Sequence, residues 1–325
     1  MAAQTVSTMT AENVPQSSFT RRLLALILLG RYYYLGGTLV LHMLGVVMAL
    51  YTGATLSLFA LFWGQIAIGA MQLMTHYSND YFDLEADRAN QTPSTFSGGS
   101  RILAAGELPA WAGLAAALFW GAVALTATFL LTFDGRSGPL TLPLLLLSLA
   151  LSWSYSAPPM RLHSRGLGEL TVAIVVGLLV PMVGFYLQTG RLTALPFLVG
   201  LPLCALQFAT IVGINFPDAE GDRAAGKDTL VIRLGPERAA WLFIAGLIVA
   251  YVLLLIGVLL GLPPLVVVIG ALTSPIALWQ GWRMAHGAWA QPEQWDSLGL
   301  WGFALVVLMA LAQIIAFLAL IGRVL

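Results

Sequence analysis

Long apolar stretches, each close to the length of a membrane-spanning helix, follow one another along most of the chain. A helix needs about 20 apolar residues to cross the hydrocarbon core of a bilayer. The expected spans are 33–52, 54–77, 109–132, 139–156, 168–189, 195–215, 239–261, 264–282 and 297–321. The pattern therefore predicts an all-α integral membrane protein with nine transmembrane helices.

Polar residues dominate the start of the chain. Residues 1–20 are rich in Ser and Thr and lack the charged start and short apolar core of a signal peptide. We expect them to form a disordered tail, followed by one transmembrane domain over residues 21–325. Residues 21–32 are expected to form a helix at the membrane interface or to extend the first span.

The composition supports this assignment and limits the partners. Of 325 residues, 59% are hydrophobic and 9% are charged, whereas a soluble domain has about 25% charged residues. Fifteen basic residues balance fifteen acidic ones, which argues against a nucleic-acid partner, since phosphate binding needs a basic surface. The expected surroundings are the lipid bilayer. Cys204 is the single cysteine, and we expect it to be a small core residue.

The basic residues are distributed unevenly between the two sides of the predicted membrane domain. With the N-terminus inside, the inner segments hold Arg21, Arg22, Arg31, Arg88, Arg101, Arg161, Arg165, Arg223, Lys227, Arg233, Arg238 and Arg283. The outer segments hold Arg136, Arg191 and Arg323. Because cytoplasmic loops collect Lys and Arg, this distribution predicts a multi-pass protein of the plasma or inner membrane. Its N-terminus and its long loops, 78–108 and 216–238, are expected in the cytoplasm.

Those two loops contain the same acidic motif. The stretch "DLEADRA" at 83–89 recurs as "DAEGDRA" at 218–224, and residue 218 minus residue 83 gives an offset of 135. Each copy follows an apolar helix and is preceded by an asparagine, Asn79 or Asn215. The chain is therefore expected to be an internally repeated bundle, in which each half contributes one carboxylate edge.

The aspartates of each copy are spaced so that they share one face of a helix. Residues four apart on a helix are neighbours, which aligns Asp83 with Asp87, and Asp218 with Asp222. Like charges this close need a cation, and Mg²⁺ prefers oxygen ligands while keeping water and substrate phosphates in its shell. The expected metal ligands are Asn79, Asp80, Asp83, Asp87, Asp218 and Asp222. The alternative is a pair of acidic, solvated helix ends.

The motifs resemble those of the UbiA superfamily of membrane prenyltransferases. Its signature N-D-x-x-D-x-x-x-D is matched from Asn79 to Asp87, and its signature D-x-x-x-D is matched by Asp218 and Asp222. The resemblance implies that Mg²⁺ binds the diphosphate of a polyprenyl donor and that the allylic chain passes to a small aromatic or other acceptor. It also makes Asp83, Asp87, Asp218 and Asp222 the catalytic residues.

Several polar residues near the motifs are candidates for binding the substrates. Basic side chains can bind diphosphate oxygens, although they can also be topology anchors or partners of nearby aspartates. The resemblance to the UbiA superfamily implies that a Tyr-Ser pair and a basic residue of the loop 154–169 lie at the substrate pocket. In this chain Leu162 occupies the position of the expected basic residue. The candidate residues are Arg31, Asn79, Arg88, Arg101, Tyr155, Ser156, Arg161, Asn215 and Lys227.

A glycine-rich loop at 94–109 is expected to close over the site on the cytoplasmic side. Gly98 and Gly99 allow the backbone amides to turn toward an anion, and Arg101 can hold a carboxylate. An ordinary mobile loop is the alternative. Closure would keep water away from an allylic cation.

The loops "FSGGSR" and "YSAPP…RGLGE" most resemble the branch that uses 1,4-dihydroxy-2-naphthoate in menaquinone biosynthesis. Acceptors of the 4-hydroxybenzoate, homogentisate, chlorophyllide, haem or archaeal-lipid type are alternatives within the superfamily. A transporter is a rival from another class, because carriers also have internal repeats and intramembrane charges. A scaffold that only binds lipid is a third possibility.

Overall fold

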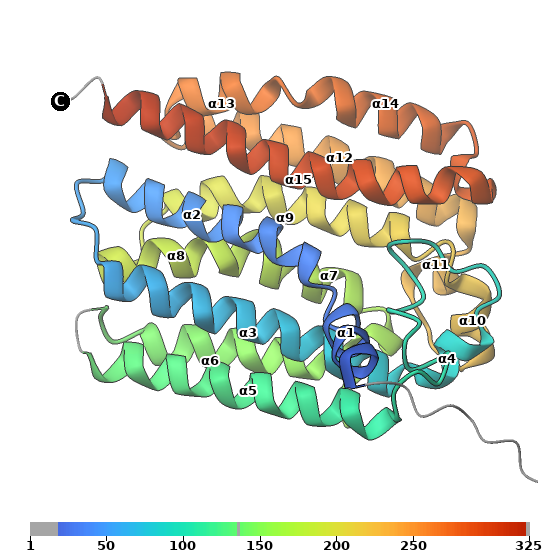
Figure 1. Cartoon of the computed structure of the whole chain (residues 1–325). Helices are drawn as coiled ribbons and strands as arrows, with labels where there is room; N and C mark the ends of the chain where they lie inside the picture. Colours follow the sequence, from blue (N-terminus) through green and yellow to red (C-terminus); the bar gives the residue numbers. More distant parts are fainter. Residues whose placement is uncertain (1–18, 135–136, 323–325) are drawn as a thin grey trace, which may run out of the picture.

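The computed structural model describes residues 19–134 and 137–322, and within these ranges it is entirely helical (Figure 1). The predicted disordered tail lies outside the described residues except for its last two positions, which begin α1 (Phe19–Leu29). Several apolar side chains of α1 are exposed, including Phe19 and Leu24. The described helix thus has the apolar surface expected of a segment at a membrane interface.

Seven helical segments of the described chain are long and apolar enough to span a membrane. They are Tyr32–Tyr51 (η1 and α2), Leu58–Phe82 (α3), Ala110–Phe133 (α5), Gly168–Thr189, Leu195–Ile214 (α9), Pro236–Leu259 (α12) and Pro292–Ile321 (α15). The fourth joins α7 (Gly168–Val172), a π-helical turn η3 (Ala173–Leu179) and α8 (Val180–Thr189). In Figure 1 these segments run side by side through the molecule.

The other two expected spans differ from single long helices. Helices α13 (Pro264–Ala271) and α14 (Ser274–Ala285) meet at a bend of 46° and together count as an eighth candidate span. Helix α6 (Thr141–Ser154) has 14 residues, about 21 Å of helix against a hydrocarbon core of about 30 Å. It nevertheless packs against α3 and α5. By length and composition the described chain therefore has seven or eight spans rather than the expected nine.

Small residues let the spans approach closely. A Cβ atom added to Gly45 of α2 would collide with the carbonyl of Pro181 and lie 2.7 Å from the backbone nitrogen of Phe185, both in α8. Conversely, a Cβ added to Gly184 of α8 would collide with the carbonyl of His42. Transmembrane helices associate largely through such close backbone packing, so this contact fixes α2 against α8.

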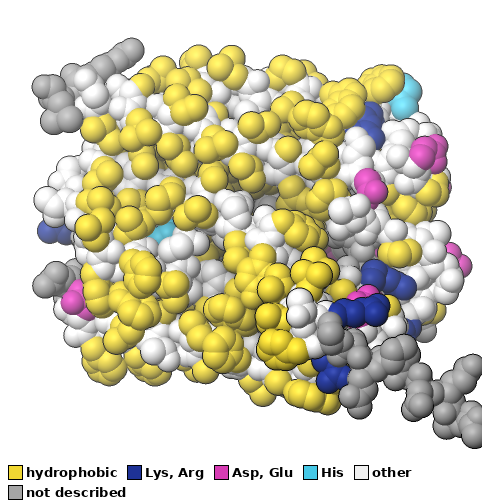
Figure 2. All heavy atoms as spheres, viewed as in Figure 1, with side chains coloured by type: hydrophobic (Ala, Val, Ile, Leu, Met, Phe, Trp, Pro, Cys, Tyr) yellow, Lys and Arg dark blue, Asp and Glu magenta, His cyan; other side chains and the backbone are white. Residues whose placement is uncertain are grey.

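The charged residues gather at the ends of the bundle. Figure 2 shows hydrophobic side chains over the middle of the visible face, with Lys, Arg, Asp and Glu toward both ends. One end holds α1 and the short helices α4 (Leu84–Ala89), α10 (Ala219–Ala224) and α11 (Leu230–Leu234) (Figure 1). Both copies of the acidic motif belong to this end, and we refer to it as the loop end.

Candidate functional site

The two copies of the acidic motif pack against each other at the loop end. Each forms a short helix, α4 in the first copy and α10 in the second, and these helices are in contact. Gly221 of α10 stands at the repeat position that Ala86 occupies in α4. A Cβ added to Gly221 would lie 2.9 Å from the Cα of Asn90, so the glycine permits this close approach.

Lys227 joins the two repeats. Its Nζ lies 2.9 Å from Asp83 Oδ2 and 2.9 Å from Asp222 Oδ1, and its side chain is buried. Burial alone would lower the pKa of Lys227, but the two carboxylates raise it above its ordinary value. Lys227 is therefore a buried cation held between one aspartate of each motif.

Asp83 is surrounded by hydrogen-bond donors. Besides Lys227, it accepts hydrogen bonds from Asn79 Nδ2 at 2.5 Å and faces His163 Nε2 at 2.6 Å. Burial would raise the pKa of Asp83, but Lys227 and His163 together lower it below its usual range. His163 Nδ1 in turn faces the carbonyl of Tyr155 at 2.6 Å. Both ring nitrogens thus face oxygen atoms, which fixes the orientation of the imidazole.

Asp80 binds the start of the first span and the glycine-rich loop. Arg31 Nη2 donates to Asp80 Oδ1 at 2.7 Å, and the backbone nitrogen of Ser100 donates to Asp80 Oδ2 at 2.9 Å. Arg31 has a positive φ of 48°, a conformation that costs a non-glycine residue free energy. This turn precedes η1 and places the guanidinium over the aspartate and beside Asn79 Oδ1.

The remaining aspartates are less well neutralised. Burial, followed by repulsion from Asp80 and Asp83, raises the pKa of Asp87 to about 8. Burial and repulsion from Asp222 raise the pKa of Asp218 to about 7, and burial also raises the pKa of Asp222. Carboxylates with such raised pKa values are short of positive charge, which a cation would supply.

The donor set fits Mg²⁺ bound through few carboxylates. A Cβ added to Gly99 would collide with Asp87 Oδ2 and lie 3.2 Å from Asp80 Oδ1, so oxygens from both aspartates converge on one point of the backbone. Within residues 19–134 and 137–322, no three His, Cys, Asp or Glu side chains are placed to hold one metal ion together. Mg²⁺ commonly takes one or two carboxylates and completes its shell with water and substrate phosphates, so the converging oxygens of Asp80 and Asp87 suit it.

The glycine-rich loop packs over these aspartates and contacts them directly. The backbone nitrogen of Gly98 donates to Asp218 Oδ2 at 3.1 Å, and Arg101 donates to the carbonyl of Asp87. At its other side, the backbone nitrogen of Thr95 donates to Asp296 Oδ1 at 2.6 Å. The loop therefore contacts both repeats and α15. Whether it opens and closes as a cap stays a prediction.

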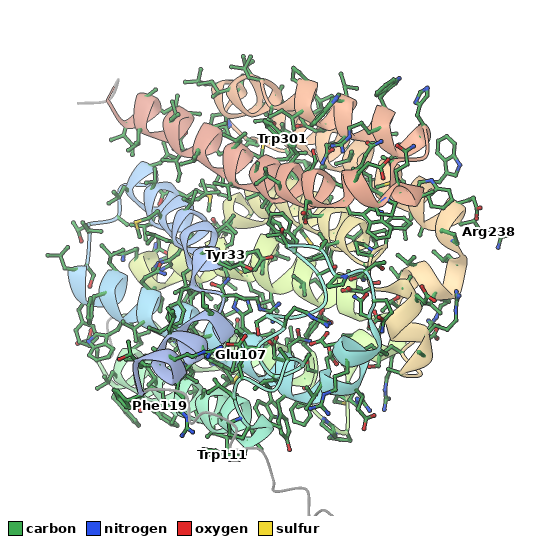
Figure 3. The ribbon with its side chains drawn as sticks, turned by 45° about the vertical axis from the view of Figure 1, so that its right-hand side comes forward. Tyr33, Glu107, Trp111, Phe119, Arg238 and Trp301 are labelled. Carbon is green, nitrogen blue, oxygen red and sulfur yellow. The ribbon has the colours of Figure 1, made fainter. Side chains whose placement is uncertain are left out.

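Two adjoining cavities meet at the acidic residues. The smaller, about 100 Å³, is polar, and we refer to it as the polar pocket; five of its lining residues are Asp or Glu. The larger, about 480 Å³, is mostly apolar, and we refer to it as the apolar cavity. Residues that line both are Arg31, Asn79, Phe96, Tyr155 and Ile214. Figure 3, turned so that the loop end comes forward, shows Tyr33 of η1, which also lines the apolar cavity.

Most of the expected site residues line one or both cavities, but five do not: Asp80, Ser156, Arg88, Arg101 and Arg161. Ser156 is buried and accepts a hydrogen bond from Asn79 Nδ2 at 3.2 Å, and Asn215 lines the polar pocket. Arg88 and Arg161 are exposed. Arg101 is half-buried and contacts the backbone of the first motif instead. Arg31 and Lys227 are the basic candidates that reach the polar pocket.

Three polar residues of the site were not among the sequence candidates. His163 contacts Asp83, Asn90 Nδ2 donates to Asp218 Oδ1 at 2.7 Å, and Glu169 lines the polar pocket. His163 and Glu169 both belong to the loop 154–169 that the sequence singled out. His163 directly follows Leu162, the position at which a basic residue was expected, and it lines the polar pocket.

The sequence and the fold of this chain are similar to those of known proteins. The sequence pattern of the UbiA prenyltransferase family matches residues 38–296. A 1,4-dihydroxy-2-naphthoate octaprenyltransferase of Bacillus subtilis is 27% identical over 60% of this chain and 59% of its own length. A 2-carboxy-1,4-naphthoquinone phytyltransferase of Synechocystis is 32% identical over 36% of this chain and 38% of its own. The chain thus matches less than two thirds of the length of these two relatives.

Longer matches come from one further relative and from solved structures. A 1,4-dihydroxy-2-naphthoate octaprenyltransferase of Mycobacterium tuberculosis is 28% identical over 70% of this chain and 76% of its own length. A UbiA homolog from Aeropyrum pernix has a TM-score of 0.66 at 21% identity, covering 86% of this chain and 97% of that one. A UbiA homolog from Archaeoglobus fulgidus bound to GPP and Mg²⁺ has a TM-score of 0.61 at 16% identity, covering 92% and 99%. These structures share the fold of this chain.

Proposed function

Because this chain belongs to the UbiA prenyltransferase family, we propose that it transfers a polyprenyl chain from an allylic diphosphate to an aromatic acceptor within the membrane. The observation that supports this most strongly is the junction of a carboxylate-lined polar pocket with a larger apolar cavity, through Arg31, Asn79 and Tyr155. A substrate with a charged head and a long apolar tail needs both compartments.

The polar pocket suits the diphosphate head. Asp87, Asp218 and Asp222 line the pocket, and Asp80 converges with Asp87 near Gly99. These aspartates would hold Mg²⁺, which would neutralise the negative charge that develops on the leaving diphosphate. Lys227 and Arg31 line the same pocket and can donate to the diphosphate oxygens. Arg31 Nε is buried without a hydrogen-bond partner, so one donor of this guanidinium is available to an anionic group.

The apolar cavity suits the prenyl chain and the reacting allyl group. Aromatic rings of Tyr34, Phe96 and Phe303 line it, and Phe303 packs against the other two with ring centroids 5.0 and 5.6 Å apart. Aromatic faces stabilise a nearby cation without attacking it as water would. The cavity therefore offers a water-poor path in which an allylic carbocation can meet the acceptor ring.

For the acceptor we propose 1,4-dihydroxy-2-naphthoate, as in menaquinone biosynthesis. This rests on the sequence resemblance and on the names of the relatives in Bacillus subtilis and Mycobacterium tuberculosis. The ring carbon that carries the carboxylate would bond to the allylic carbon as the C–O bond to diphosphate breaks. The carboxylate would then leave that carbon as carbon dioxide, and its bonding electron pair would restore the aromatic ring. We further propose that the loop end faces the cytoplasm and that the protein lies in the plasma or inner membrane.

An acceptor panel tests this proposal. Purified protein in lipid nanodiscs would receive Mg²⁺, a labelled long-chain prenyl diphosphate and one acceptor at a time. We expect prenylation of 1,4-dihydroxy-2-naphthoate with release of carbon dioxide, and loss of the product when EDTA is present. Preference for 4-hydroxybenzoate or a tetrapyrrole would reject the acceptor but not prenyl transfer. Uptake into vesicles without product would instead favour a transporter, and binding alone would favour a scaffold.

A further inference from the structure

Glu169 is a buried carboxylate that lies outside both aspartate motifs. It is the second residue of α7, its side chain is 1% exposed, and it lines the polar pocket on the side of α9. The proposed reaction, as derived from the aspartates and the basic residues, gives it no role. A buried carboxylate oxygen that lacks a hydrogen bond is costly, so the partners of its two oxygens indicate what the pocket can bind.

One oxygen of Glu169 is fully occupied. Oε1 accepts hydrogen bonds from Asn215 Nδ2 at 3.0 Å and from the backbone nitrogen of Leu230 at 2.8 Å. These bonds join α7 to the end of α9 and the start of α11. They also fix the plane of the carboxylate, so that the position of the second oxygen is set by the fold.

The second oxygen has no partner. Glu169 Oε2 is buried without a hydrogen bond, and the hydroxyl of Thr229, also buried and lining the polar pocket, has none either. Buried polar atoms in folded proteins are nearly always hydrogen-bonded. Two orphaned oxygens in one pocket therefore mark a place where a bound molecule supplies the missing donor and acceptor.

We propose that Glu169 Oε2 and Thr229 Oγ1 bind a hydroxyl group of the aromatic acceptor; this rests on the proposed prenyl transfer. Oε2 is a hydrogen-bond acceptor, so its partner must carry a donor, which an O–H group supplies and an ionised phosphate or carboxylate oxygen does not. The Thr229 hydroxyl can both donate and accept, so it can bind the oxygen of the same group. Glu169 and Thr229 thereby select a phenol and place its ring beside Tyr155 and Ile214, which line the junction of the two cavities.

The experiment compares Glu169→Gln with wild type on three acceptors: 1,4-dihydroxy-2-naphthoate and its two analogues that each lack one hydroxyl. Dividing the wild-type kcat/KM by that of the variant on each acceptor removes the intrinsic reactivity of the ring. We expect a ratio of about 10 to 100 for acceptors that keep the contacted hydroxyl, as for a hydrogen bond to a charged group. On the analogue that lacks it the ratio should be close to one. If the panel selects another phenol, that phenol and its deoxy analogue replace the naphthoates.

Two further variants separate binding from structure. Glu85→Gln changes an exposed carboxylate of α4 and should give a ratio near one on every acceptor. Thr229→Val removes the hydroxyl but keeps the shape and the Oε1 hydrogen bonds, and should lower kcat/KM three- to tenfold with the same acceptor dependence. The KM for the prenyl diphosphate should stay within twofold of wild type in all variants.

The outcomes are distinguishable. An unchanged kcat/KM in Glu169→Gln, or an equal loss on all acceptors, would overturn the assignment, because the first shows no role and the second a structural one. A wild-type protein that turns over no acceptor would instead reject prenyl transfer, and the hydroxyl site with it.

Discussion

Each carboxylate oxygen of Asp218, in the second motif, accepts a hydrogen bond from the first half of the chain. Asn90 donates to its Oδ1 and the backbone of Gly98 donates to its Oδ2. Asp218→Asn keeps the size of the side chain but removes the charge that would hold Mg²⁺. We expect prenyl transfer to fall by about 100- to 1,000-fold, the effect of removing one group that stabilises transition-state charge. Assays in nanodiscs at saturating Mg²⁺ measure this.

The matched control is Glu220→Gln, which changes an exposed carboxylate two residues away on α10. It should leave turnover within twofold of wild type. Comparable losses in both variants would indicate that general negative charge at the loop end matters, and not the metal site.

Protons and Mg²⁺ should compete for the same carboxylates. The pKa values of about 8 for Asp87 and about 7 for Asp218 mean that both are largely protonated at pH 6. Mg²⁺ must displace these protons, so its affinity should rise as the pH rises from 6 to 9 and level off above about 9. The stability of the metal-free protein should change in the opposite direction. Because these carboxylate pKa values are raised in the folded state, the free energy of unfolding should fall as the pH rises toward 8.

Thermal-shift titrations with Mg²⁺ at pH 6, 7, 8 and 9 test this competition. Asp87→Asn should flatten the pH dependence, because one of the competing protons is removed. An Mg²⁺ affinity that does not change with pH in the wild type would show that Asp87 and Asp218 do not bind the ion.

Some residues of the site could be identified from the sequence, and others could not. The repeated spacing identified the aspartates, and proximity in sequence to the second motif pointed to Lys227. Arg88 directly follows Asp87, the last aspartate of the first motif. Because adjacent residues of a helix point about 100° apart, the Arg88 side chain faces solvent while Asp87 is buried. His163 and Asn90 meet their aspartates from 80 and 128 residues away. Contacts at such distances depend on how the helices pack, which no local pattern records.

Among the elements, the crossing of α2 and α8 offers a direct test of packing. Gly45→Ala would force a Cβ into the carbonyl of Pro181, a backbone atom that cannot move without shifting α8. We expect the melting temperature in detergent to fall by several degrees, since overpacking typically costs about 1–3 kcal/mol. Gly36→Ala, in the same helix with nothing within 4 Å of the added Cβ, should leave it unchanged or slightly higher. Equal melting temperatures for the two variants would contradict the crossing.

The extent of each helix was only partly predictable. Apolar windows placed the spans to within a few residues, since membrane helices must satisfy their own backbone hydrogen bonds. The bend between α13 and α14 has a signal in Pro275, whose ring interferes with the turn before it. Next to the bend, Thr273 Oγ1 donates a hydrogen bond to the carbonyl of Gly270 at 2.7 Å.

For the molecule as a whole, the position of the loop end relative to the membrane is open to experiment. Thr95→Cys and Asp228→Cys lie at the loop end, and Leu192→Cys lies between α8 and α9, at the opposite end of both helices. In a Cys204→Ser background, a membrane-impermeant maleimide should label the first two from the cytoplasmic side only. Because the basic residues cluster at the loop end, Leu192→Cys should be labelled from outside only. Labelling of position 95 or 228 from outside would reverse the proposed orientation.

The ion pairs of Lys227 with Asp83 and Asp222 make the two halves of the chain depend on each other. A break in the connection Gly190–Ala194, between α8 and α9, would leave one acidic motif on each fragment and would separate Asp83 from Lys227, which stays with Asp222 on the second fragment. Neither fragment alone should transfer a prenyl chain. Co-expressed fragments should recover turnover to the extent that they reassociate, because α15 packs on α2 and α9 packs on η3 across the break. The turnover recovered by the co-expressed fragments would then measure how much of the bundle has assembled.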